Sequence, residues 1–503
     1  MTAKAPVPTI PSTVVATLRG RSESVPQWGH ARLLGSGGRN PRQAAQRESC
    51  IPERYHGAPL LPALISRSRP RFGKTRSAPR SDILSAVTVR RLDVVRESFR
   101  PVYTVWELTL ACDQRCVHCG SRADVERAGE LTTAEALVVA ADLVSMGAAE
   151  VALIGGEAYL HSGFLEIVSA LAQGGVRVTM TTGGRRLGPA LARDMASAGL
   201  SAVSVSVDGL EHTHDRMRAS RGSFVAATEA IAALRVAGID AFANTNVNRY
   251  NQSDLEAVYE HLRGTGIKAW QVQLTTPLGR AADRPDMILQ PYDLPALLPR
   301  IARLKERAFD DGILLLPGNN LGYFGPEEPL LRSLSRDGED HFRGCQAGRF
   351  VLGIESDGGV KGCPSLQSGP YVGGKLREQS LQTVWDTAPE LAFTRVRGVE
   401  SLWGFCRTCD FAEVCLGGCT FTAHAILGRP GNNPYCHFRA RTLAQRGLRE
   451  RLVLTEAAPG QPFDNGRFEV VEEPIGSPEP RFPEVPERLL QIRRPGTSSG
   501  LPA

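Results

Sequence analysis

The sequence VWELTLACDQRCVHC, residues 105–119, decides the fold because a short apolar run leads directly into three closely spaced cysteines. The apolar run Val105–Leu110 has the length of a β-strand. Cys112, Cys116 and Cys119 then lie on one loop at the carboxyl end of that strand, which is where parallel α/β barrels hold their active sites. The stretch therefore predicts an active site that binds a metal or an iron-sulfur cluster at the mouth of a barrel.

Downstream, short apolar runs alternate with helix-length segments, which is the sequence form of repeated strand–helix units around a parallel sheet. We expect strands at residues 105–110, 150–154, 177–181, 202–207, 241–247 and 269–274. We expect helices at residues 133–146, 163–172, 189–198, 224–237, 253–263 and 294–308. These units are too few for a full eight-unit barrel of about 250 residues. The expected fold class is therefore α/β, with a partial (β/α)6 TIM-like barrel followed by a small cysteine-rich domain.

The composition bounds the class of protein. With 503 residues, 42% of them hydrophobic, the chain can form a large core and more than one domain. The excess of basic residues behind the net charge of +6 lies before Arg100, the remainder is mildly acidic, and no later stretch interleaves basic and aromatic residues, so we expect no nucleic-acid partner. No apolar run is long enough to span a membrane, and prolines interrupt the start, so we expect a cytoplasmic protein without a membrane partner. In that reducing compartment, the eleven cysteines indicate metal ligation rather than disulfides.

The two ends of the chain differ in composition from the middle. Residues 1–95 are rich in Arg, Ser, Pro and Gly without a sustained period, so we expect a disordered N-terminal extension. An organelle transit peptide and an over-extended start are both consistent with this composition. Cys50 lies in the extension and is expected to be a free thiol. The proline-rich residues 455–503 are expected to form an extended or disordered tail.

Three cysteines suit a 4Fe-4S cluster with one iron that lacks a protein ligand, whereas a closed zinc site needs four ligands. His118 could be a fourth zinc ligand, but the loop is too tight to bring all four side chains inward easily. The C-x₃-C-x₂-C spacing after a strand resembles the radical S-adenosylmethionine (SAM) superfamily. The resemblance implies that the open iron binds SAM and that a 5′-deoxyadenosyl radical abstracts hydrogen from an unactivated carbon. The residue before the last cysteine is often aromatic in that family, and His118 is a planar substitute.

Motifs at later strand ends support the resemblance. Gly155-Gly156-Glu157 resembles the family's motif for the methionine amine, because two glycines permit close backbone approach and a carboxylate meets an ammonium. Ser206-Val-Asp208-Gly209, continuing to Arg218, is similar to peptide-modifying members, in which the serine and arginine contact the SAM carboxylate. A plain strand–helix turn and a solvated arginine would explain the same residues without a cofactor. The resemblance implies a cofactor site of His118, Gly155, Gly156, Glu157, Ser206, Asp208 and Arg218. Further candidate contacts are Thr181, Thr182, Gly183, Gly184, Asn244, Asn246 and Asn248.

A second group of cysteines reads Cys345-x₁₂-Gly358-x₄-Cys363, then Cys406-x₂-Cys409-x₅-Cys415-x₃-Cys419, and finally Cys436. This spacing resembles the SPASM extension of peptide and sulfatase maturases, which holds auxiliary 4Fe-4S clusters; a pair of zinc ribbons is the alternative. By resemblance, one cluster is held by Cys406, Cys409, Cys415 and Cys436. The other is held by Cys345, Cys363 and Cys419 and lacks one ligand. Asp340 or His341 could supply that ligand, an open iron could bind substrate, or the cluster could be absent. We expect this iron-sulfur domain to span residues 340–440.

The resemblance covers residues 100–440, with a radical SAM core at 100–315. It implies an enzyme that uses SAM, one catalytic and one or two auxiliary 4Fe-4S clusters, and an external reductant such as ferredoxin or flavodoxin. SPASM proteins most often act on ribosomally made peptides, which implies a maturase that modifies a side chain or backbone carbon of a precursor peptide or protein. Formylglycine formation is a narrower possibility, but sulfatase maturases have an aspartate where Pro364 stands. A radical reaction on a small molecule and a noncatalytic electron-transfer or scaffold protein also remain open at this point.

Overall fold

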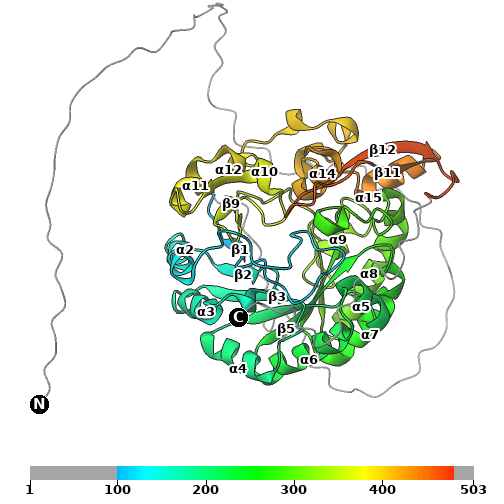
Figure 1. Ribbon diagram of the computed structural model, residues 1–503. Coiled ribbons are helices and arrows are strands. Elements are labelled where there is room, and N and C mark those ends of the chain that lie inside the picture. The colour runs from blue at the N-terminus through cyan, green and yellow to red at the C-terminus, as the bar shows by residue number, and fades with distance from the viewer. Residues whose placement is uncertain (1–98, 481–503) are drawn as a thin grey trace, which may run out of the picture. The chain divides into compact units, whose positions relative to one another are not determined.

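The structure, a computed structural model, describes residues 99–480 (Figure 1). The predictions for the N-terminal extension, for Cys50 and for residues 481–503 lie outside this range. Among the described helices, none combines the length and the apolar character needed to cross a membrane.

Parallel strands that pair in sequence order form the inner layer of the first part of the fold. They are β1 (Tyr103–Glu107), β2 (Glu150–Ile154), β3 (Arg177–Thr182), β4 (Ala202–Ser206), β5 (Asp240–Val247), β6 (Ala269–Leu274) and β7 (Leu314–Pro317). The first six coincide with the expected strands apart from their ends, and the α/β fold with a partial TIM-like barrel is confirmed. The seventh was not expected, because its four residues form a short apolar run that ends in a proline.

Helices cover the outer face of the curved sheet (Figure 1). They are α2 (Thr133–Ser145), α3 (Phe164–Gln173), α4 (Pro189–Ala198), α6 (Ser223–Val236), α7 (Leu255–Thr265) and α8 (Leu294–Asp310). Local sequence sets their ends. A capping box between Thr132 and Glu135 begins α2, and Gly199, in the left-handed conformation, ends α4. A shorter helix, α5 (Glu211–Arg218), follows β4 and carries Arg218 in its last turn.

The cysteine-rich segment extends the same sheet. β8 (Val351–Ile354) pairs in parallel with β1, and the antiparallel strands β9 (Gly359–Lys361) and β10 (Val372–Lys375) continue the sheet beyond it. This pairing places Cys363, two residues after β9, beside β8, the strand that joins this segment to the first barrel strand. The remaining helices are short: α9 (Glu328–Arg332), α10 (Ser368–Tyr371), α11 (Leu381–Thr387), α12 (Pro389–Ala392), α13 (Ala412–Cys415), α14 (Thr420–Leu427) and α15 (His437–Ala444).

An antiparallel hairpin of β11 (Leu448–Glu456) and β12 (Arg467–Pro474) follows α15. Residues 467–474 therefore form a paired strand, which differs from the extended or disordered tail expected from residue 455. Phe468 on β12 packs into the main core, and β12 lies against α14 (Figure 1). The prolines that suggested an irregular tail lie in the connecting loop or from Pro474 onward, where they do not interrupt the pairing.

Candidate functional site

A cavity of ≈330 Å³ lies at the carboxyl ends of the barrel strands. All residues predicted for the catalytic cluster and for the cofactor line this cavity, with the exception of Asp208. The parallel pairing of β1 to β6 explains this, because successive strand ends meet at one edge of the sheet. The candidate contacts Thr181, Thr182, Gly183, Asn244 and Asn246 also line the cavity, whereas Gly184 and Asn248 are not among its lining residues.

The three cysteines after β1 lie on a loop whose two ends are held together. The Cys112 N–H donates to Asp124 O (3.1 Å), and the Asp124 N–H donates to Leu110 O (3.0 Å). Burial raises the pKa of the Cys116 thiol to about 11, although nearby Arg218 lowers it. Burial also raises the pKa of Cys112, and Glu157, Cys116 and Cys119 raise it further. All three cysteines line the same cavity, as ligands of one cluster must.

Gly155 and Gly156 bring the end of β2 against the cysteine loop. A Cβ atom on Gly155 would lie 2.3 Å from Thr109 O, and one on Gly156 would lie 2.2 Å from Ala111 O and 2.7 Å from Cys112 Cβ. No side chain fits at those distances. The glycines are thus needed for backbone contact between β2 and the cysteine loop, a role beyond the cofactor contact that their motif indicates.

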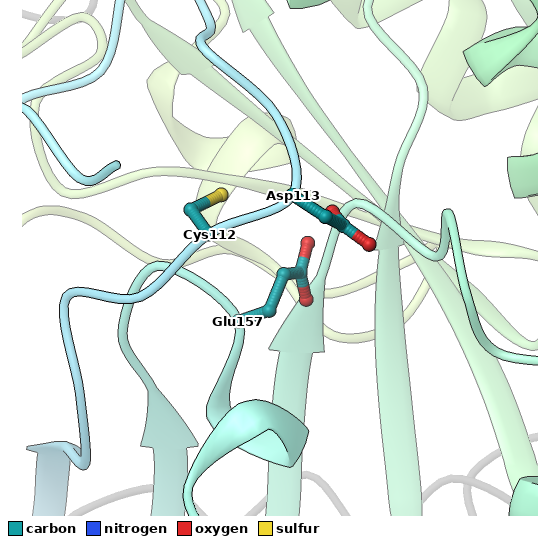
Figure 2. A group of neighbouring side chains, drawn as sticks. All are labelled: Cys112, Asp113 and Glu157. Atoms are coloured by element: carbon teal, nitrogen blue, oxygen red, sulfur yellow. The ribbon is translucent and has the colours of Figure 1, made fainter. Parts of the chain in front are cut away.

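Glu157, at the end of this motif, points toward Asp113 and Cys112 (Figure 2). The ligand atoms of the three residues lie within 4.8 Å of one another. Glu157 is 2% exposed; it accepts hydrogen bonds from the Gly183 N–H (2.8 Å) and from the Thr182 hydroxyl. Burial and then the Asp113 carboxylate raise the pKa of Glu157 to about 8. Two buried carboxyl groups side by side favour a cation, such as an ammonium group, between them.

Asp208 lies behind the cavity wall and holds two of its residues. This fully buried carboxylate has one oxygen 2.5 Å from Arg218 Nη2 and 3.4 Å from His118 Nε2, and the other accepts the Asn246 N–H (2.9 Å). Arg218 in turn places Nη1 3.6 Å from Cys116 Sγ. Asp208 is not among the residues that line the cavity, and its carboxylate contacts Arg218 and His118, which do line it.

Other buried polar atoms fit a polar cofactor. Arg218 Nε and Gln114 Nε2 are buried donors without a hydrogen-bond partner among the described residues, and both side chains belong to the cavity wall. Ser206 also lines the cavity, with its hydroxyl 3.3 Å from Asn244 Oδ1. Three thiols for a cluster, an acid pair for an ammonium and free donors for a carboxylate together suit SAM bound to a 4Fe-4S cluster.

The predicted group of four cysteines lines a single small pocket. Cys406, Cys409, Cys415 and Cys436 lie in its wall, which also contains four phenylalanines: Phe324, Phe405, Phe411 and Phe438. Burial raises the pKa of the Cys415 thiol, and the other three cysteines raise it further. Four thiols in one apolar enclosure match the donor set of a 4Fe-4S cluster.

The predicted group of three cysteines also comes together. Burial, and after it Cys345 and Cys363, raise the pKa of Cys419 to about 12. The two candidates for a fourth ligand have contacts elsewhere: Asp340 pairs with Arg343 (3.2 Å), and the exposed His341 lies 6.1 Å from the ring of Phe324, in the wall of the four-cysteine pocket. These contacts give no support to either residue as the missing ligand.

Several cavity residues were missed in the sequence. Pro364 follows Cys363 and Phe421 lies two residues after Cys419, so the three-cysteine group borders the catalytic cavity. Phe463, from the β11–β12 hairpin, also lines the cavity, although the composition of its segment suggested a tail. Glu107, at the end of β1, is a buried carboxyl group whose pKa is raised to about 7, chiefly by burial. A glutamate within an expected strand gave no signal that it faces an active site.

Comparisons with known proteins agree with this geometry. Residues 106–262 match the family model of the Radical SAM superfamily, and residues 345–410 match SPASM, an iron-sulfur cluster-binding domain. The AdoMet-dependent heme synthase of Methanosarcina barkeri is 31% identical over 349 residues, which cover 67% of this chain and 97% of that protein. Mycofactocin maturase MftC of Mycobacterium ulcerans is 30% identical over 356 residues, which cover 69% of this chain and 90% of that protein.

Solved structures share the fold at low sequence identity. The native anSMEcpe with bound AdoMet has a TM-score of 0.54 at 16% identity, covering 68% of this chain and 95% of that chain. Streptococcus suis SuiB bound to S-adenosylmethionine has a TM-score of 0.53 at 15% identity, covering 67% of this chain and 76% of that chain. From the family matches, the relatives and the site together, the chain belongs to the radical SAM superfamily and is an enzyme of that family with a C-terminal SPASM domain.

Proposed function

We propose that this enzyme modifies a side-chain or backbone carbon of a ribosomally made precursor peptide. Cys112, Cys116 and Cys119 would hold the catalytic 4Fe-4S cluster that the family uses together with SAM. When bound, the cluster and SAM supply a 5′-deoxyadenosyl radical that abstracts a hydrogen atom from the substrate.

The polar residues of the cavity divide the work of binding SAM. In this proposal, Glu157 and Asp113 receive the ammonium group of the methionine moiety, since both carboxyl groups are buried and face each other. Arg218 and Gln114 belong to the cavity wall, and each has a nitrogen donor without a hydrogen-bond partner among the described residues. In this proposal these donors receive the carboxylate. Asp208 orients Arg218 without contact to the cofactor.

The composition of the cavity wall supports a peptide as the substrate. Away from the cysteines, the wall is rich in neutral amide and hydroxyl side chains: Asn244, Asn246, Gln273, Thr275, Thr276 and Asn320. In this proposal neither arginine in the wall is available to the substrate. Arg218 pairs with Asp208 and receives the SAM carboxylate, and Arg280 donates to Cys116 O (2.7 Å) and Ala123 O (2.9 Å). Neutral donors and acceptors suit the backbone and side chains of a peptide.

A porphyrin is the competing substrate, because relatives at similar identity include an AdoMet-dependent heme synthase and an Fe-coproporphyrin III synthase. Such molecules carry several propionate groups, and carboxylates are best recognised by free arginine or lysine side chains. Among the described residues that line the cavity, the two arginines are committed, there is no lysine, and Glu107 and Glu157 add acidic groups. This wall favours a peptide over a polyanionic porphyrin.

The two other cysteine groups would hold auxiliary clusters. The four-cysteine pocket offers a complete set of protein ligands, whereas the three-cysteine group needs a further ligand. We further propose that a ferredoxin or flavodoxin in the cytoplasm supplies the electrons. Iron and sulfide counts on single-group variants would test these assignments.

The experiment compares two substrates under anaerobic conditions. Reconstituted enzyme, SAM and dithionite are incubated either with the product of a precursor-peptide gene beside this one or with Fe-coproporphyrin III. A variant with alanine at Cys112, Cys116 and Cys119 is the control. We expect the peptide to increase 5′-deoxyadenosine formation and to change in mass only with the wild-type enzyme. Conversion of the porphyrin without conversion of the peptide would overturn the proposal.

A further inference from the structure

The loop that joins β11 and β12, residues 457–466, reaches back to the catalytic cysteine loop. The Phe463 N–H donates to Gly120 O (3.2 Å), directly after Cys119. The next residue, Asp464, accepts the Gly279 N–H on its backbone oxygen (2.7 Å). These bonds fix this hairpin loop at the rim of the cavity.

Charged groups add a second attachment. Arg122, three residues after Cys119, places Nε 2.9 Å from Asp464 Oδ1, although the two are 342 residues apart in sequence. The other Asp464 oxygen accepts the Gln461 N–H (2.8 Å), so the same carboxylate also closes the turn of the loop. Arg122 itself is held by Asp283 (2.6 Å). The loop is therefore positioned before any substrate arrives.

The ring of Phe463 is held in the cavity wall. It is 7% exposed and packs with Leu278, Ala425 and Phe421. The Lys361 ammonium lies 3.8 Å from the ring centroid, and Glu355 (2.8 Å) binds that ammonium in turn. A cation over an aromatic ring stabilises its position.

Three of these side chains, Leu278, Phe421 and Phe463, line the cavity, and we name them the apolar wall. They come from three distant parts of the chain: the segment after β6, helix α14 and the hairpin loop. The rest of the substrate side of the cavity consists largely of neutral polar groups. Contact between an apolar surface and an apolar group is favourable because it removes apolar area from water. Aromatic rings contribute most of that buried area.

We propose that the apolar wall is a subsite for an aliphatic or aromatic side chain of the substrate peptide, and that Phe463 is its specificity-determining residue. This inference rests on the proposed function, because it requires a peptide in the cavity. The neutral amide and hydroxyl groups contact the peptide backbone, and the apolar wall selects which residue lies beside the catalytic cysteines. The hairpin loop thereby contributes to recognition.

The test uses Phe463→Ala, the conservative Phe463→Leu, and Glu469→Ala on an exposed position of β12 as the matched control. An alanine scan of the precursor peptide with wild-type enzyme first identifies its apolar contact residue. Kinetics of peptide modification then give kcat and KM for each enzyme with the original peptide and with the alanine-substituted peptide. Iron counts show whether each variant keeps its clusters.

We expect Phe463→Ala to lower kcat/KM by about 10-fold or more, mainly through KM, with an unchanged iron count. Phe463→Leu should recover much of this loss, and Glu469→Ala should match wild type. The alanine-substituted peptide should lose little further with Phe463→Ala, because both changes remove the same contact. Wild-type kinetics for Phe463→Ala, or losses that add independently, would overturn the subsite.

A second measurement separates failure of the subsite from failure of the proposed function. The rate at which bathophenanthroline disulfonate removes iron from the reduced enzyme needs no substrate. Phe463→Ala should accelerate removal from the catalytic cluster, because it opens the cavity wall, and Glu469→Ala should not. An unchanged rate would contradict the placement of Phe463. If the rate rises but wild-type enzyme modifies no peptide, the proposed function and the peptide subsite fail, and only the placement of the ring stands.

Discussion

Substitution of Asp208 by asparagine tests the buried network behind the catalytic cysteines. Asp208 is fully buried, lies 2.5 Å from Arg218 Nη2, and faces a His118 side chain that burial keeps neutral, with its pKa lowered to about 4. Burial opposes the charge of Asp208, but Arg218 together with the other polar groups around the carboxylate outweighs burial and lowers its pKa. The asparagine keeps the size and one acceptor oxygen, so the change removes mainly the charge.

The expected cost follows from the burial of both partners. Loss of one member of a buried ion pair destabilises a protein by about 3–5 kcal/mol, because the other charge stays buried without compensation. We therefore expect the thermal midpoint of the reconstituted protein to fall by roughly 5 °C or more. Since Arg218 Nη1 lies 3.6 Å from Cys116 Sγ, the electron paramagnetic resonance spectrum of the reduced catalytic cluster should change as well.

The matched control is Glu256→Gln, which removes a charge at the same distance on the surface. Glu256 Oε2 lies 2.5 Å from Arg300 Nη2, but the two side chains are 46% and 26% exposed. An exposed pair contributes less than about 1 kcal/mol. Equal midpoints for the two variants, together with an unchanged cluster spectrum in Asp208→Asn, would refute the reasoning.

Three further predictions concern pH, packing and metal content. Because the pKa of Glu107 is raised to about 7, the folded protein holds this proton more tightly than the unfolded chain does. The free energy of unfolding that the proton contributes is fully present below the unfolded pKa and is lost as pH rises through 7. The thermal midpoint of the wild-type protein should therefore fall between pH 5 and 8, and that of Glu107→Gln should lack this fall. Gly156→Ala should reduce iron at the catalytic site because its Cβ meets the cysteine loop, whereas Gly188→Ala, with open space around the Cβ, should keep wild-type iron. Cys415→Ala should lose about four irons per chain, and Cys50→Ala none.

The sequence predicted those strands and helices that a local pattern of residues marks. Strands β2 and β6 and helix α4 have the expected bounds, because short apolar runs and a Pro-to-Gly helix frame mark them. The two auxiliary cysteine groups also come together as the resemblance to the SPASM extension implied.

Long-range contacts were not predictable. Asp113 faces Glu157 only because β1 and β2 are neighbours, and nothing in the cysteine motif distinguishes it from the residues beside it. Asp208 pairs with Arg218 outside the cavity lining, a contact that motif position alone does not show. Phe463 reaches the active site through a hydrogen bond to Gly120, far away in sequence, and a proline-rich composition concealed the strand that follows it.

The most direct test of the central claim follows the abstracted hydrogen atom. Uniformly deuterated precursor peptide is incubated with the reconstituted enzyme, SAM and dithionite, and the 5′-deoxyadenosine is examined by mass spectrometry. The proposed function predicts transfer of deuterium from the peptide into 5′-deoxyadenosine, together with a modified peptide. Unlabelled 5′-deoxyadenosine and an unchanged peptide, with deuterium transferred instead from labelled Fe-coproporphyrin III, would contradict it.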